Sequence, residues 1–495
     1  MIRRRTITSY VWNSVSGNKM VILSNCIRNF FRKFELLGNS TQGENPVPDN
    51  PQEIESVGRK SKNLLNLQKQ PDVKETYLGW KVSDGRNVVL SVKDKGNNAD
   101  ITGCYLGLSR TGGSSDGVVW VVNNGSVAVK EVVSKNQYVS VFPSNETTVR
   151  KLLERFDIQV EYGNNATDYE PYGYLLDVKV TGKNLLDMAD IQNENGKIDS
   201  DFSKAKSIKS FKVIKDRKYL LISKGTMIVD VRYSSIYFGE DDLAYGQDSS
   251  RKLTTGTGYS CFIGTETRKI LVAKETCTIT KTMMHGTRTE KDAYEVEELG
   301  LFEIIDDNPN IGYEPYTEQF VQIALDEPLR GIGEYKDVLT KDGVVRKIHE
   351  QTLKKEQISM NEYNWDTKYF RLYVNPDKKI DSSINIHELF SNMFKKFVIY
   401  KGNPNVYWVI SEEEIRSMGI TETDSLQVAY EKIKDFVTTN DIVIQYPIVE
   451  TTLEPLPESV QQQLQALHSE NGVAHVFVDS GEVEAGINIE YKCKS

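Results

Sequence analysis

The side chains in this sequence with the clearest chemical potential are aromatic. Trp and Tyr present flat apolar faces that stack on the C–H faces of sugar rings, while nearby polar groups bond the sugar hydroxyls. Several aromatic residues fall in or beside strand-like runs and are candidates for such glycan contacts. They are Trp80, Tyr105, Trp120, Tyr233, Tyr237 and Tyr259. The alternative for each residue is packing in a core or ordinary strand propensity.

Motifs for catalysis and metal binding are missing from the sequence. Gly331–Gly333 lacks the third glycine of a phosphate-binding loop, and the five histidines form no metalloprotease pair. Asn193–Gly196 resembles part of a calcium loop, but Ile191 and Phe202 stand where that loop needs carboxylates. The 70 acidic residues offer many pairs with the chemistry of a glycosidase, but surface solvation is the default explanation for any one pair. We therefore expect no catalytic residue, metal site or cofactor.

Composition narrows the class of protein. A chain of 495 residues with 39% hydrophobic and 26% charged residues is globular and long enough for two to four domains. Its net charge of −9 gives no basic surface for nucleic acid. No apolar run reaches the length of a membrane span, and a polar segment follows Arg3–Arg5 where a signal peptide would be apolar. Five scattered cysteines favour reduced thiols in a protein made in a cytoplasm.

The elements that must position the aromatic residues are strands. The run 118–122 and the run 126–133 flank Asn124–Gly125, and this dipeptide predicts a type I′ hairpin; Asp84–Gly85 is a weaker case. Short strand candidates also lie at 218–223, 227–233 and 269–273, with a turn at Asn195–Gly196 before them. Such spacing predicts antiparallel β-sandwiches over both segments.

Two short motifs recur in the same order and indicate a duplicated module. Lys62–Leu65 recurs as Lys183–Leu186, and the motif Tyr-Glu-Pro-Tyr occurs at 169–172 and again at 313–316. We expect the prolines to fix the chain as it leaves each sandwich and the tyrosines to clamp that exit against the module. The residues concerned are Tyr169, Pro171, Tyr172, Tyr313, Pro315 and Tyr316. The predicted modules are 59–176 and 177–320, both jelly-roll-like.

The remaining segments differ in character. Residues 1–58 form an N-terminal segment with a Pro-rich connector, and 321–380 contain a hairpin around Lys341–Gly343. Residues 381–495 predict an α+β region. One helix there is indicated by apolar residues at helical spacing from Leu426 to Val437, with Asp424 as N-cap; a second helix starts near Pro457, and strands follow at 474–478 and 487–491.

The N-terminal segment carries apolar groups that need burial, because it is too short for a core of its own. These groups are Val21–Leu23, Phe30, Phe31 and Phe34. A neighbouring subunit or another protein of an assembly is one partner that would bury them. The other explanation is that they add a strand to the first sandwich.

Taken together, these motifs resemble a family of tail and baseplate proteins from phages and prophages of Firmicutes-type bacteria. The resemblance rests on 43–58, 62–65, 158–163, 166–172 and 328–333, and it extends over most of residues 35–350. It implies carbohydrate-binding-like jelly rolls in a virion component near the host-facing end of the tail. It implies several copies in a symmetric assembly and no catalytic residues.

We therefore expect a mainly-β, non-enzymatic structural protein of a phage tail, made in the host cytoplasm and assembled into the virion. Its expected partners are other tail and baseplate proteins, further copies of itself, and host cell-wall polysaccharide bound through the sandwiches. Repeated weak binding units would gain avidity. One alternative is a scaffold or spacer that binds no glycan, and the other is a tail-associated enzyme that degrades glycan.

Overall fold

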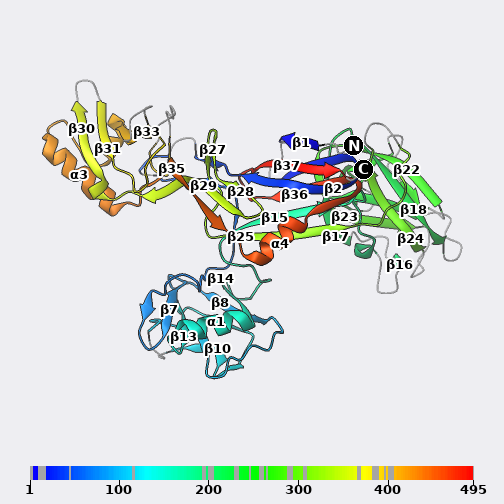
Figure 1. Cartoon of the computed structure of the whole chain (residues 1–495), viewed down its shortest axis with the longest axis horizontal. Helices are drawn as coiled ribbons and strands as arrows, with labels where there is room; N and C mark the ends of the chain where they lie inside the picture. Colours follow the sequence, from blue (N-terminus) through cyan, green and yellow to red (C-terminus); the bar gives the residue numbers. More distant parts are fainter. Residues whose placement is uncertain are drawn as a thin grey trace.

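A computed structural model shows three lobes around a central sheet (Figure 1). It describes residues 4–8, 18–43, 46–48, 50–113, 117–191, 197–198, 206–227, 234–244, 247–255, 261–263, 266–286, 294–304, 309–364, 369–381, 389–394, 397–399 and 406–493. Strands dominate these residues and pair antiparallel throughout, so the predicted mainly-β class is confirmed. The expected turn at Asn195–Gly196 and the candidates Tyr233 and Tyr259 lie outside the described residues.

The central sheet collects strands from the whole chain. It runs in the order β25-β15-β36-β2-β28-β29-β35-β32, with β1, β5 and β37 attached, and α4 packs Leu464 into its core. The elements are β1 (Arg4–Thr8), β2 (Asn18–Leu37), β5 (Arg59–Lys60), β15 (Tyr174–Thr181), β25 (Glu318–Leu325), β28 (Val338–Leu339), β29 (Gly343–Thr352), β32 (Phe390–Ser391), β35 (Val443–Pro455), α4 (Glu458–Ala466), β36 (His468–Asp479) and β37 (Gly486–Cys493). Short hairpins beside the sheet are β3 (Ser40–Thr41) with β4 (Glu55–Ser56), and β26 (Gly331–Ile332) with β27 (Tyr335–Lys336).

The N-terminal segment belongs to this central sheet. Strand β2 pairs with β36 and β37, and β1 pairs with β37, so the two ends of the chain meet (Figure 1). Phe31 and Phe34 are buried in the core of the sheet. The expected extra strand on the first sandwich is therefore wrong. The expected neighbouring subunit is not needed for burial of these two rings, because the chain's own C-terminal strands supply it.

The first lobe is a two-layer sandwich inserted between β5 and β15. One layer has the order β11-β10-β9-β13-β7-β6 and the other the order β12-β8-β14. The elements are β6 (Val73–Lys74), β7 (Leu78–Lys81), β8 (Val88–Asp94), β9 (Tyr105–Ser109), β10 (Val119–Asn123), β11 (Ser126–Val127), β12 (Glu131–Ser134), β13 (Tyr138–Phe142), α1 (Glu146–Arg155) and β14 (Phe156–Tyr162).

The turn signals of this lobe had different outcomes. Asn124 and Gly125 both have positive φ, 49° and 77°, and join β10 to β11 as the predicted hairpin. Asp84–Gly85 joins β7 to β8, which belong to different layers, so the hairpin expected there is wrong.

The second lobe is inserted between β15 and β25. Its layers are β16-β24-β18-β22-β20 and β17-β23-β19-β21. The elements are η1 (Met188–Asp190), β16 (Lys197–Ile198), β17 (Lys206–Val213), β18 (Lys218–Met227), β19 (Ser234–Gly239), η2 (Asp248–Ser250), β20 (Leu253–Thr254), β21 (Cys261–Ile263), β22 (Glu266–Ala273), β23 (Cys277–Gly286) and β24 (Tyr294–Glu303). In one layer of each sandwich, β7-β13-β9-β10 matches β17-β23-β19-β21; in the other layer, β12-β8-β14 matches β22-β18-β24. The two sandwiches therefore share one strand order.

The first copy of the repeated opening motif closes its sandwich through a buried asparagine. The Asn63 side-chain nitrogen donates to the carbonyl oxygens of Ile158 (3.1 Å) and Glu170 (3.2 Å). Its side-chain oxygen accepts from the backbone N–H groups of Leu65 (3.1 Å) and Val160 (3.0 Å). One side chain thus ties the opening motif to the last strand and to the closing motif.

The second copy makes the same connections. Asn184 donates to the carbonyl oxygens of Leu299 (3.4 Å) and Glu314 (3.2 Å), and accepts from the N–H groups of Leu186 and Leu301 (both 3.0 Å). Both opening motifs therefore bond the glutamate carbonyl of their own closing motif. Recurrence of four bonds at matching positions is what duplication of a module would produce.

The third lobe lies between β29 and β35 and pairs a four-stranded sheet with helices. Its elements are η3 (Lys355–Gln357), β30 (Ile358–Asn364), β31 (Tyr369–Val374), β33 (Phe397–Ile399), β34 (Val406–Ile410), α2 (Glu412–Ser417) and α3 (Leu426–Thr439). Ile433 and Val437 of α3 pack into its core, but the N-cap is Ser425 and not the expected Asp424.

The predicted division of the chain at residue 380 is wrong. Residues 353–448 supply the core of this lobe, while β28, β29, β36 and β37 belong to the central sheet. No helix among the described residues is long and apolar enough to cross a membrane.

Candidate functional site

Four aromatic side chains gather on the outer face of the first sandwich, and we call Tyr77, Tyr105, Trp120 and Phe142 the aromatic platform. Tyr105 contacts Trp120 and Phe142 edge to face, with ring centroids 5.5 and 5.6 Å apart. Tyr77 lies 5.0 Å from Phe142 and 6.1 Å from Trp120. All four side chains are half-buried, so each ring retains accessible surface.

Strand alternation places these rings outside the core. Successive side chains of a strand point to opposite faces, so buried Leu106 and Leu108 leave Tyr105 on the outer face of β9. Strand β13 aligns Phe142 directly opposite Tyr105. A Cβ at Gly107 would lie 2.9 Å from the Trp120 ring, so the missing side chain lets the indole lie over β9. The platform thus depends on three neighbouring strands and one glycine.

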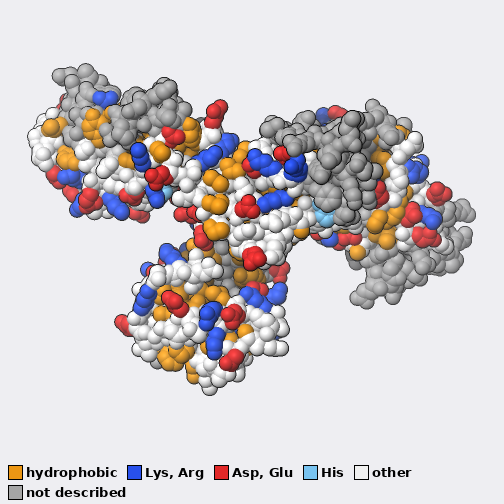
Figure 2. Space-filling view, viewed as in Figure 1, with side chains coloured by type: hydrophobic (Ala, Val, Ile, Leu, Met, Phe, Trp, Pro, Cys, Tyr) orange, Lys and Arg blue, Asp and Glu red, His pale blue; other side chains and the backbone are white. Residues whose placement is uncertain are grey.

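The chemistry open to the platform is stacking on an apolar face. Among the described residues, no Lys or Arg side chain lies over any of its four rings. The rings are therefore available for C–H groups of a ligand, the contact that a pyranose face offers. On the visible face of the described residues, positive and negative side chains are interspersed, without a large area of one sign (Figure 2).

The predicted aromatic candidates differ in whether their rings are exposed or buried. Tyr105 and Trp120 belong to the platform, whereas Trp80 is 5% exposed in the core and donates its indole N–H to the carbonyl oxygen of Lys69 (2.9 Å). Tyr237 is buried beneath the guanidinium of Arg251, 4.0 Å from the ring centroid. Trp80 and Tyr237 are therefore core or covered residues with little accessible ring surface, as the packing alternative for each predicts.

Two members of the platform, Tyr77 and Phe142, were not among the predicted candidates. The signal that could have found Tyr77 is its phase: Leu78 and Trp80 are buried, so the residue before them points outward. Phe142 ends β13 after the buried pair Val139 and Val141, which gives it the same outward phase. Only the folded structure shows that Phe142 meets Tyr105, and that Tyr77 meets Phe142 and Trp120.

Among the described residues of the second sandwich, the strand equivalent to β9 carries different outer side chains. Strand β19 buries Ile236 and Phe238 in the core as β9 buries Leu106 and Leu108. This phase puts Ser235 at the position of Tyr105 and places Tyr237 at that of Gly107. The two equivalent strands therefore present different side chains at these two outer positions.

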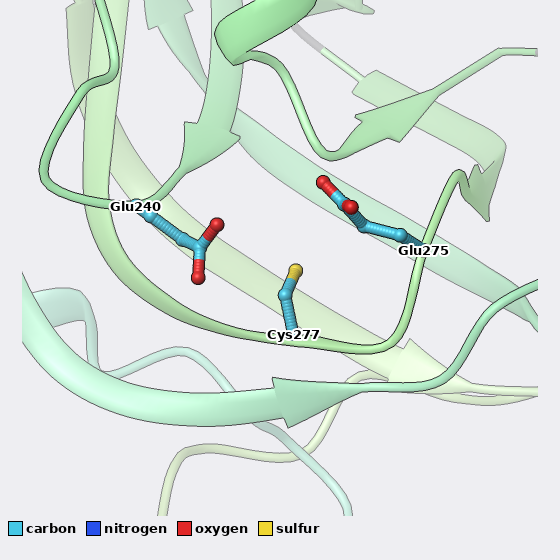
Figure 3. A group of neighbouring side chains, drawn as sticks. All are labelled: Glu240, Glu275 and Cys277. Carbon is cyan, nitrogen blue, oxygen red and sulfur yellow. The ribbon is translucent and has the colours of Figure 1, made fainter. Parts of the chain in front are cut away.

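A cluster of candidate metal ligands also comes together in the second sandwich. Glu240, Glu275 and Cys277 point toward one another (Figure 3), with one ligand atom from each within 4.8 Å of the others. The Lys252 ammonium lies 2.9 Å from Glu240 and 2.6 Å from Glu275. Lysine therefore already supplies the positive charge that these two carboxylates need, and we assign no metal to the cluster.

The environment of Cys277 predicts that its thiol reacts slowly with alkylating agents. Burial, and then the nearby Glu240 carboxylate, raise the pKa of this thiol to about 12. Since only the thiolate reacts, we expect iodoacetamide at pH 8 to label Cys277 at least a hundredfold more slowly in the folded protein than after unfolding in urea. Mass spectrometry of the Cys277 peptide measures both rates. Equal rates would contradict this burial.

Comparisons with known proteins add little. No family model matches the chain, and no curated protein matches it. A likeness to the crystal structure of the infectious bursal disease virus VP2 subviral particle covers 98% of this chain and 82% of that chain, at 8% identity and a TM-score of 0.10. At that score the likeness carries no argument about fold or function.

Proposed function

We propose that the protein is a non-enzymatic component of a phage tail or baseplate, and that it binds host cell-surface glycan through the aromatic platform. The observation that carries glycan binding is the group of four accessible rings on one face of the first sandwich. The assignment to a tail rests on the sequence resemblance over most of residues 35–350. Assembly with further copies and with other tail proteins follows from that resemblance.

The way the first lobe is attached supports a role in presentation. The chain enters it from β5 and leaves it into β15, and these two strands pair, with Lys60 opposite Tyr174. Both connections therefore lie at one end of the lobe, where Asn63 closes it. Strand β10, which carries Trp120, is drawn at the other end, away from the central sheet (Figure 1). A module held at one end leaves the rest of its surface open to a partner.

A second candidate function is a scaffold or spacer without glycan binding. The second sandwich favours it, because that module repeats the strand order and the buried asparagine, while its Tyr237, at the position of Gly107, is covered by Arg251. Glycan degradation is a third class, for which we place no catalytic residue. Release of reducing sugar from wall polysaccharide would support that class, provided that it survives repurification and one carboxylate substitution abolishes it.

The proposal predicts how removal of the Trp120 indole changes the affinity for cell walls. In sedimentation with purified cell walls from a panel of Firmicutes strains, we expect the full-length protein to bind walls of at least one strain. Trp120→Ala should raise the Kd about tenfold, equivalent to about 1.4 kcal/mol, because stacking on the ring is lost. Trp120→Phe should retain most of the affinity.

Controls separate binding from folding. Phe320→Ala removes an exposed aromatic ring from β25, outside the first sandwich, and should leave the Kd unchanged. The melting temperature of Trp120→Ala should stay close to that of the parent protein, since the indole is only half-buried. Absence of binding to any wall, or equal binding by Trp120→Ala, would refute the platform and favour the scaffold.

A further inference from the structure

The two closing motifs are used differently, although their sequences are identical. In the second copy both tyrosines have partners: Tyr313 packs against Phe302 at 6.4 Å, and Tyr316 donates a hydrogen bond to Glu318. The Lys209 ammonium lies 5.1 Å from the Tyr316 ring centroid. Here the clamp expected from the sequence is present.

The first copy leaves its tyrosines open. Tyr169 and Tyr172 are 37% and 40% exposed. Among the described residues, neither ring has an aromatic or cationic partner, and neither hydroxyl has a hydrogen-bond partner. The expected clamp is therefore wrong for this copy, where Asn63 and Arg59 hold the motif through Glu170 instead. Two unpaired rings in a motif that is packed elsewhere in the same chain are free for another contact.

Both open rings line a crevice between the first sandwich and the central sheet. The crevice has a volume of about 850 Å³, within the usual range for ligand sites. The opposite wall includes Leu453 of β35, which is 59% exposed. Asn66, Gln68 and Asp326, which carry hydrogen-bonding side chains, also line the crevice. Aromatic faces thus combine with hydrogen-bonding groups in one place.

The charges of the lining favour an uncharged ligand. The Lys95 ammonium is 3.3 Å from Asp157, and the Arg346 guanidinium is paired with Asp337 (3.1 Å) and Glu454 (2.8 Å). Both cations of the crevice are therefore already neutralised. An anionic ligand would also meet the carboxylate of Asp326. A phosphate-rich or acidic polymer would find no free positive partner among these groups.

We propose that this crevice is a second saccharide site, which takes a short segment of a neutral oligosaccharide. Tyr169 and Tyr172 stack on pyranose faces, while Asn66, Gln68 and Asp326 bond the hydroxyl groups. The site is separate from the aromatic platform, so it goes beyond the proposed function and does not depend on it. Two sites on one lobe would bind a long wall polysaccharide more tightly than either site alone.

The experiment isolates the crevice by working in full-length protein that carries Trp120→Ala and Tyr105→Ala. Chitotetraose, cellotetraose and maltotetraose are titrated, and binding is followed by saturation-transfer NMR and calorimetry. We expect at least one tetrasaccharide to bind this platform-deficient protein. Adding Tyr169→Ala and Tyr172→Ala should weaken that binding at least tenfold, and the corresponding Phe substitutions should preserve it.

A matched control is Tyr162→Ala, which removes another exposed tyrosine of the same lobe, one that lies under Arg86 and outside the crevice. It should leave binding unchanged. If no tetrasaccharide binds the platform-deficient protein, or if the Tyr169 and Tyr172 substitutions have no effect, the crevice proposal is overturned. Self-association that these substitutions abolish, without saccharide binding, would instead assign the crevice to a second copy of the chain. Failure of the platform would show separately, as unchanged wall binding by Trp120→Ala.

Discussion

Replacing Asp337 by alanine is expected to lower the free energy of unfolding of the central sheet by about 3–5 kcal/mol. The carboxylate is fully buried and contacts the Arg346 guanidinium at 3.1 Å. It also accepts from the backbone N–H groups of Arg330 (3.0 Å), Lys347 (2.7 Å) and Ile348 (3.0 Å). Alanine would leave a buried cation and three N–H groups without this acceptor.

The measurement must resolve one part of a multi-lobed chain, because a single two-state transition is not expected. Hydrogen exchange of peptides that cover β28 and β29 should become faster in Asp337→Ala, while peptides from α3 and β9 should keep their protection. Asp441→Ala, which removes an exposed carboxylate, serves as the control. Unchanged exchange in β28 and β29 would show that the carboxylate does not hold these strands.

Local signals made part of the fold predictable from the sequence. The hairpin at Asn124–Gly125 could be predicted because a type I′ turn requires positive φ at two adjacent residues, and few residue types tolerate it. The repeated motifs could be recognised because Asn63 and Asn184 must each stand at a fixed point in their module. Both signals act over a few residues.

The central sheet could not be predicted, because its strands are far apart in the chain. Strand β2 finds its partners in β36 and β37 at the opposite end of the sequence. Strands β15 and β25 pair with each other across the whole second sandwich. The sequence showed apolar groups such as Phe31 and Phe34 in need of burial, but nothing local identified the strands that cover them.

The candidate site was predictable only in part, for a related reason. Trp80 and Trp120 both lie in strands, yet one faces the core and the other faces outward. Phase within a strand decides this, and Trp80 shares its phase with buried Leu78. That Tyr105 stands opposite Phe142 depends on the register of two separate strands. Residue types therefore identified part of the platform, while its assembly required the paired sheet.

The asparagines that close the two sandwiches should each contribute strongly to the stability of their own module. Asn63→Ala removes four hydrogen bonds and leaves one buried and one partly buried carbonyl oxygen, and two buried N–H groups, without these partners. An unpaired buried polar group costs about 1–3 kcal/mol, so we expect the first sandwich to lose about 3 kcal/mol or more after partial relaxation. Asn184→Ala should do the same in the second sandwich, since its four bonds are equivalent.

Each substitution should destabilise its own sandwich and leave the other one unchanged. In Asn63→Ala, hydrogen exchange should accelerate in β14 and its partner β8, while β24 and β18 of the second sandwich stay protected. In Asn184→Ala the pattern should reverse. Asn165→Ala, at an exposed position near the first closing motif, should change neither module. If either buried substitution loosened both sandwiches equally, the modules would not be independent folding units. If neither had an effect, the repeated asparagine would not be the group that joins the opening motif to the closing motif.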